Sequence, residues 1–179
     1  MVDSRIDTYQ HIQTVQRYVG AVVSDLQRRS QEHDQSKLAS PEKEIFDEFT
    51  PKLASSTYGS DEYKTFLGQM KPALDHHYTN NDHHPEYHKV VRCSDCGESY
   101  PINYEPAVCL YCTAPIVRTF DIRLMNLVQL IEMLCDWKAA TMRHNDGDIR
   151  RSIEINQKRF GYSDELKVIL LNTLAVIEG

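Results

Sequence analysis

The sequence predicts an all-α fold, a bundle of six or seven helices interrupted by one small zinc ribbon. Apolar residues recur at three- and four-residue steps over most of the chain, which is the period of an amphipathic helix. Helix-capping residues stand at the start of several of these stretches, and strand signals are almost absent outside a segment with four cysteines. A chain of 179 residues is long enough for one domain with a real core and a small insertion.

The first predicted helix covers residues 4–29. His11 lies at the edge of its apolar stripe, and a short turn leads from the helix to the adjacent pair His33 and Asp34. The apolar stripe consists of Ile6, Tyr9, Ile12, Val15, Tyr18, Val22 and Leu26.

The next helices are predicted from their starts. Ser40 followed by Pro41 is typical of a helix N-terminus, and this helix is expected to run to about Leu53. After a loop, Ser60 caps a further helix that leads toward a histidine-rich segment, and Pro72 predicts a kink in it.

The C-terminal part of the chain predicts three more helices. Residues 79–92 are polar and irregular, and a strongly apolar helix is expected over residues 120–144. The following helix begins at Asp148, reaches residue 160 and stops at Gly161. The last helix is capped by Ser163 and is rich in Leu, Ile and Val.

Four of the five cysteines form two C-x-x-C pairs, and we expect them to bind one structural zinc ion. The ribbon is predicted as an insertion at residues 91–118, between two parts of one helical domain at 1–90 and 119–179. A surface that recognises a partner or nucleic acid is the alternative role for it, and Cys135 is expected in the core. The four predicted zinc ligands are Cys93, Cys96, Cys109 and Cys112.

Histidines and aspartates suggest a second metal site, because helices of a bundle can bring such residues together. Asp136 lies on the apolar helix, where a buried carboxylate needs a partner such as a metal ion, although Lys138 or Arg143 could also satisfy it. The other residues of this set are His11, His33, Asp34, His76, His77, His83 and His84.

The order His11, then His33-Asp34, then Asp136 resembles the H…HD…D signature of the HD superfamily of metal-dependent phosphohydrolases. Residues 33–37 also resemble the HD-x-x-K form of its phosphodiesterase branch. The rest of the chain outside the cysteine segment is similar to an HD-type family found in phages and bacteria. The Gly-Tyr-Pro triplet of the branch that cleaves cyclic-di-GMP is absent from the sequence.

The resemblance implies an HD-like helical bundle and roles for particular residues. The core ligands would be His11, His33, Asp34 and Asp136. Asp34 would bridge two metals if two are bound, and His77 and His84 would hold the second one, with His83 as the alternative to His84. The metals would be Mn, Fe, Co, Mg or Zn.

The chemistry expected is metal-assisted hydrolysis of a phosphate ester, in which bound metals activate water. Lys37 would stabilise charge on the phosphoryl oxygens and Glu86 would carry a proton or orient a histidine ligand. The candidate contacts to phosphate or base are Tyr58, Lys64, Lys138, Arg143 and Arg159.

Several functions stay open from sequence. A nucleotidase or nucleoside triphosphatase is expected first, followed by a phosphodiesterase on a cyclic or oligonucleotide signal. A di-iron oxygenase, and a binding module that carries a degenerate HD site and the zinc ribbon, are the remaining alternatives.

The composition of the chain limits the kinds of partner and the cellular location that we expect. The net charge of −6 argues against general nucleic-acid binding but does not exclude a small phosphorylated ligand such as a nucleotide. We expect a cytoplasmic protein, because no apolar run of 18 residues predicts a membrane span, the N-terminus is not typical of a signal peptide and paired cysteines favour a reduced compartment. A homo-oligomer is compatible with the sequence.

Overall fold

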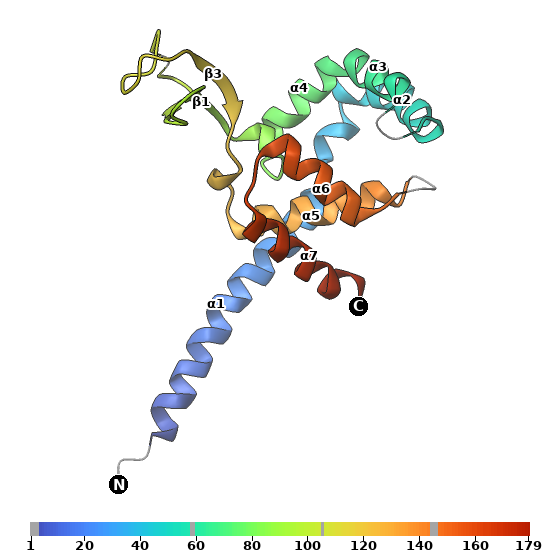
Figure 1. Ribbon diagram of the computed structural model, residues 1–179. Helices are drawn as coiled ribbons and strands as arrows, with labels where there is room; N and C mark the ends of the chain where they lie inside the picture. The colour runs from blue at the N-terminus through green and yellow to red at the C-terminus, as the bar shows by residue number, and fades with distance from the viewer. Residues whose placement is uncertain (1–3, 58–59, 105, 144–146) are drawn as a thin grey trace. The chain divides into compact units, whose positions relative to one another are not determined.

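The computed structural model describes residues 4–57, 60–104, 106–143 and 147–179. The chain divides into two compact units, Met1–His33 and Asp34–Gly179, and each is described by itself. The described residues are mostly helical and contain one three-stranded sheet, in agreement with the predicted class (Figure 1).

The first unit is one continuous helix, α1, which spans Arg5–Glu32. It is longer than predicted, because it continues through the polar residues 30–32 and ends at His33, whose backbone leaves the helical conformation. An α-helix of 28 residues extends about 42 Å at 1.5 Å per residue.

The second unit contains the remaining helices and the sheet. Its elements in chain order are η1 (Gln35–Leu38), α2 (Glu42–Ser55), α3 (Asp61–Gln69), α4 (Lys71–Asn80), η2 (Pro85–Tyr87), β1 (Lys89–Cys93), β2 (Ser99–Pro101), β3 (Ile116–Phe120), η3 (Ile122–Leu124), α5 (Leu127–Thr141), α6 (Ile149–Phe160) and α7 (Asp164–Glu178).

Local capping accounts for most helix starts in this unit. The side chains of Ser60, Asp148 and Ser163 each accept a backbone N–H of the first turn, as their positions in the sequence predict. Gly161 ends α6 in the left-handed conformation with φ 66°. The helix expected to kink at Pro72 is instead two helices, α3 and α4, that meet at Met70, and the proline occupies the first turn of α4.

The sheet has the strand order β2-β1-β3, with both pairs antiparallel. Val91 in the central strand is fully buried and pairs with Tyr100 on one side and Arg118 on the other. The strands begin at Lys89 and end at Phe120, so the sheet extends slightly beyond the segment predicted as the ribbon, and the helix predicted from residue 120 begins only at Leu127.

The main hydrophobic core lies among η3, α5, α6 and α7. Met133 and Leu134 of α5, Ile153 of α6 and Leu174 of α7 have no exposed surface. The ring of Trp137 stacks on Phe160 with centroids 6.0 Å apart and planes 8° from parallel. This packing fixes α5 against α6, and both helices contribute residues to the site described next.

Candidate metal centre

Asp34 is the residue on which the site is centred. It stands in the left-handed region at φ 56°, an uncommon conformation for a residue other than glycine, immediately before η1. Its Oδ2 accepts a bond of 2.6 Å from Lys37 Nζ. Burial alone would raise the pKa of Asp34, but the bond from His77 and the nearby Lys37 ammonium outweigh burial and hold the pKa well below its usual range. Asp34 is therefore ionised at neutral pH.

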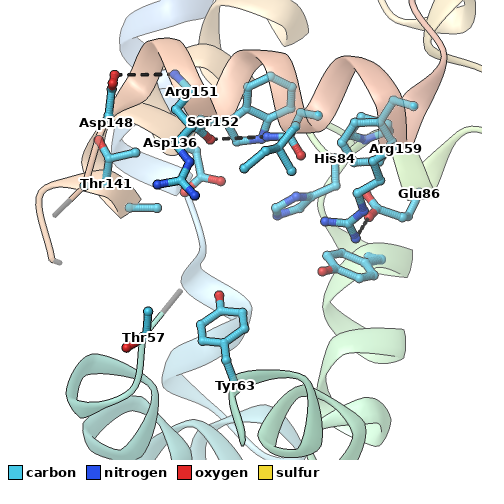
Figure 2. Close-up of a pocket in the computed structure, with 18 residues that line it drawn as sticks. Thr57, Tyr63, His84, Glu86, Asp136, Thr141, Asp148, Arg151, Ser152 and Arg159 are labelled. Carbon is cyan, nitrogen blue, oxygen red and sulfur yellow. Dashed lines mark hydrogen bonds and ion pairs between the residues drawn. The ribbon is translucent and has the colours of Figure 1, made fainter. Parts of the chain in front are cut away.

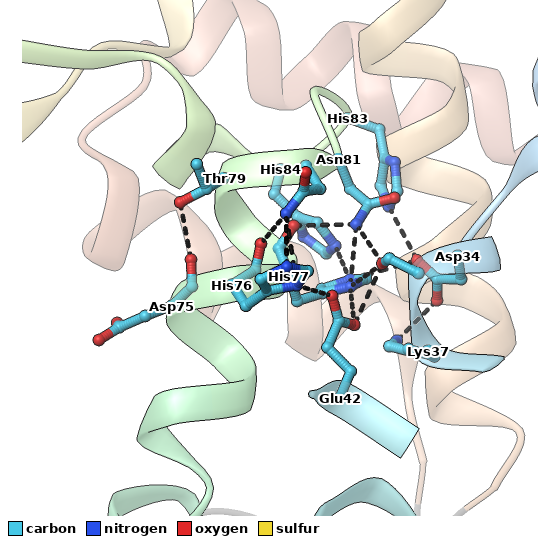
Figure 3. Close-up of polar contacts among 12 residues, drawn as sticks. Asp34, Lys37, Glu42, Asp75, His76, His77, Thr79, Asn81, His83 and His84 are labelled. Carbon is cyan, nitrogen blue, oxygen red and sulfur yellow. Dashed lines mark hydrogen bonds and ion pairs between the residues drawn. The ribbon is translucent and has the colours of Figure 1, made fainter. Parts of the chain in front are cut away.

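Two histidines, His77 and His83, place a ring nitrogen near the other oxygen of this carboxylate, and His84 lies beside His77 (Figure 3). His77 comes from α4, and His83 and His84 come from the turn between α4 and η2. Asp34 Oδ1 lies 3.2 Å from His77 Nε2 and 3.5 Å from His83 Nε2, while the Nε2 atoms of His77 and His84 are 2.9 Å apart.

These four side chains fit one metal ion. Each offers one donor atom, and the four atoms all lie within 4.8 Å of one another. Two donors in tetrahedral coordination at about 2.0–2.1 Å from zinc are about 3.3 Å apart, which is close to the separations found here. Burial and the neighbouring His83 and His77 keep the pKa of His84 well below its ordinary value, so its imidazole is neutral, the form that binds metals.

Two buried carboxylates orient the histidines, and the sequence analysis missed both. The Oε2 atom of Glu42 lies 2.9 Å from His77 Nδ1, and Glu132 Oε1 lies 3.2 Å from His83 Nδ1. A carboxylate accepts hydrogen bonds, so each Nδ1 donates its proton to the neighbouring glutamate, and the Nε2 atom of each ring lies toward Asp34. Glu132 precedes Asp136 by one helical turn, a spacing that could have revealed it.

Asp136 is a further acidic residue close to Asp34. Its carboxylate comes from α5 and lies within 4.8 Å of the Asp34 carboxylate. It also lines a cavity together with His84. The structure thus brings Asp34, His77, His83, His84 and Asp136 of the predicted set together.

His11 does not share a metal with the His33-Asp34 pair of the same chain, contrary to the ligand set implied by the resemblance. Both histidines belong to the first unit, where α1 is continuous from Arg5 to Glu32. They are 22 residues apart, which corresponds to about 33 Å along a helix axis. His76 also differs from its neighbours: 41% of its side chain is exposed, and its Nδ1 lies 2.7 Å from Glu42.

A cavity of about 260 Å³ adjoins the cluster (Figure 2). Its lining includes His84 and Asp136 from the cluster, and Glu86, whose carboxylate pairs with Arg159. Burial raises the pKa of Glu86 although the Arg159 charge opposes it. The predicted residues Glu86 and Arg159 thus lie as a pair in the lining of this cavity.

The other predicted substrate contacts lie elsewhere. Lys64 pairs with Asp61 on an exposed face of α3, and Lys138 pairs with Glu178 of α7. Arg143 is exposed and, like these two lysines, is absent from the described lining of the cavity. Tyr58 lies outside the described residues. The charged side chains of α6 that do line the cavity were not singled out from sequence, apart from Arg159.

The four cysteines of the ribbon form a second, separate cluster. The Sγ atoms lie 3.4 Å apart for Cys93 and Cys112 and 3.5 Å apart for Cys96 and Cys109, and all four fall within 4.8 Å of one another. Four thiolates about 2.3 Å from a tetrahedral zinc ion are about 3.8 Å apart. The hydroxyl of Tyr100 contacts Cys109 and lowers the pKa of this thiol to about 6, which favours the metal-binding thiolate.

The fold and these two clusters define a mostly helical protein with two places where a metal ion could be held. Residues 2–177 match the family of unknown function DUF5662, and the chain belongs to this family. No curated protein matches the sequence. No solved structure matches it either. Within the described part of the chain, no helix combines the length and the apolar character that crossing a membrane requires.

Proposed function

We propose that the protein is an HD-type metal-dependent hydrolase that cleaves a phosphate ester, with a nucleotide as the expected substrate. The observation that supports this most is the position of Asp34, whose carboxylate lies within 4.8 Å of donor nitrogens of His77, His83 and His84 and of the Asp136 carboxylate. A carboxylate in this position can bridge two metals, as in a binuclear centre.

In this proposal His77, His83, His84 and Asp34 hold one metal. Asp136 and Asp34 hold the other. The metals would supply a bound water of lowered pKa and positive charge for the phosphate oxygens. Glu42 and Glu132 keep the histidine rings in the orientation and tautomer that binding needs.

For Lys37 we infer a role in addition to the one expected from sequence. Its ammonium is bonded to Asp34 and lies 5.0 Å from the ring centroid of Phe46. We therefore infer that Lys37 keeps Asp34 ionised and positioned, which the metal ligand needs. The four-cysteine cluster is proposed to hold a structural zinc ion that stabilises the small sheet.

Phosphate release from a panel of nucleotides, measured with Mn²⁺, Mg²⁺, Co²⁺, Zn²⁺ and Fe²⁺, tests the proposal. We expect release by the wild type, a loss of at least a hundredfold in Asp136→Ala and His83→Ala, and no change in His11→Ala, the matched histidine on α1. No phosphate release by the metal-loaded wild type from any nucleotide of the panel would refute hydrolysis. The same donors suit iron, so two bound irons with a redox-active spectrum would instead favour an oxygenase.

A further inference from the structure

One face of α6 forms a wall of the cavity next to the metal cluster. Residues 151, 152, 155, 156 and 159 all line it, and this spacing places them on one side of a helix. Trp137 of α5 also lines the cavity, and Asp136 and His84 belong both to its lining and to the cluster. A ligand in this cavity therefore touches both α6 and the metal-binding residues.

The cations near this wall differ in their partners. Arg159 is paired with Glu86, and Arg150 faces away from the cavity, 3.8 Å from Glu178. The guanidinium of Arg151 points into the cavity, and among the described residues it makes no side-chain hydrogen bond or ion pair. Asp148 bonds to the backbone N–H of Arg151 and not to its guanidinium.

The remainder of the lining is suited to an organic group. Trp137, Ile155 and Phe160 offer apolar surface, and Asn156 is a buried polar side chain whose amide donates one long bond of 3.4 Å to Ser152. A pocket with apolar walls and few polar groups usually binds a small molecule through its apolar body and orients it through those polar groups. The volume of about 260 Å³ suits a small molecule and not a polymer.

We propose that this cavity binds a small organic phosphate whose anionic group contacts Arg151 and whose body lies against Trp137 and Ile155. A guanidinium can give two parallel hydrogen bonds to a phosphoryl group, so Arg151 would hold the oxygens that the metals leave free. The choice of phosphate as the anion rests on the proposed function. The assignment of Arg151 as the anion-binding residue rests on the cavity itself.

Binding of phenylphosphonate to the metal-loaded protein tests this inference without requiring turnover. Trp137 is the single tryptophan of the chain and lines the cavity, so its fluorescence reports occupancy. We expect Arg151→Ala to weaken phenylphosphonate binding about tenfold to a hundredfold, in line with the loss of hydrogen bonds to a charged group. Arg151→Lys should lose less, because it keeps the charge but not the paired donors.

The matched control is Arg150→Ala, which removes the neighbouring charge outside the cavity and should change the affinity less than twofold. Phenol, which lacks the anion, should bind equally weakly to wild type and Arg151→Ala. Unchanged phenylphosphonate binding in Arg151→Ala, or equal weakening in Arg150→Ala, would overturn the inference.

The same variants also distinguish a failure of this inference from a failure of the proposed function. Binding that depends on Arg151, in a protein that hydrolyses no nucleotide, would sustain the anion site and refute the hydrolase. Nucleotide hydrolysis with the same KM in Arg151→Ala and wild type would sustain the hydrolase and refute the role of Arg151.

Discussion

Replacing Glu42 with glutamine should weaken metal binding without changing any metal ligand. Glu42 has no exposed surface, and its carboxylate contacts His76, His77 and Ser36 at 2.7, 2.9 and 3.1 Å. An amide keeps one acceptor oxygen but presents N–H groups where a second histidine N–H now donates. We expect a loss of about 1.5–3 kcal/mol in the free energy of unfolding, the value of one hydrogen bond to a charged group.

Metal affinity should fall as well, because Glu42 orients the ring of His77. Loss of a carboxylate that orients a ligating histidine typically weakens metal binding by about 10- to 100-fold. Isothermal titration with Zn²⁺ or Mn²⁺ measures the affinity, and urea unfolding of the metal-free protein measures the stability.

Glu44→Gln is the control, because Glu44 is an exposed acid in the same helical turn of α2. It should leave both quantities within error of the wild type. Wild-type metal affinity in Glu42→Gln would refute the reasoning that Glu42 orients His77.

Three further predictions concern the ribbon, the acid stability and the core. Cys96→Ser should remove about one zinc ion per chain by elemental analysis while Cys135→Ser keeps it, and equal zinc in both variants would contradict the four-cysteine site. The bond from Arg123 lowers the pKa of Asp121 to about 2 from 3.8, so its stabilising effect is complete above about pH 4 and lost as the pH falls toward 2. The free energy of unfolding of Asp121→Asn should therefore change by up to about 2 kcal/mol less than that of the wild type between pH 4 and pH 2. An unchanged pH profile would show that the ion pair contributes nothing. Leu134→Ala should cost about 2–5 kcal/mol in urea unfolding because Leu134 is fully buried, and a loss below about 1 kcal/mol would contradict the described core.

Features set by neighbouring residues could be predicted from the sequence. Ser60, Asp148 and Ser163 cap the helices that they precede, and Gly161 ends α6, because capping depends on a few consecutive residues. The two cysteine pairs were recognisable for the same reason, since each short loop presents two thiols.

Features set by distant contacts could not be predicted. Glu42 and His77 are 35 positions apart, and Glu42 looked like an ordinary acid in the first turn of a helix. β1 forms a strand by pairing with β2 and β3, and β3 pairs with β1 across the ribbon, so the local pattern could not show where these strands begin and end. The polar residues 30–32 continue α1 to Glu32, an extension that depends on the rest of the helix and that their own sequence did not indicate.

Elemental analysis of the purified protein, beside His83→Ala and Cys96→Ser, tests the central claim most directly. The account predicts one or two metal ions that are lost with His83 and about one zinc ion that is lost with Cys96, each independently of the other. A wild type that contains a single zinc ion, retained in His83→Ala and lost in Cys96→Ser, would contradict a metal centre at Asp34 and the histidines.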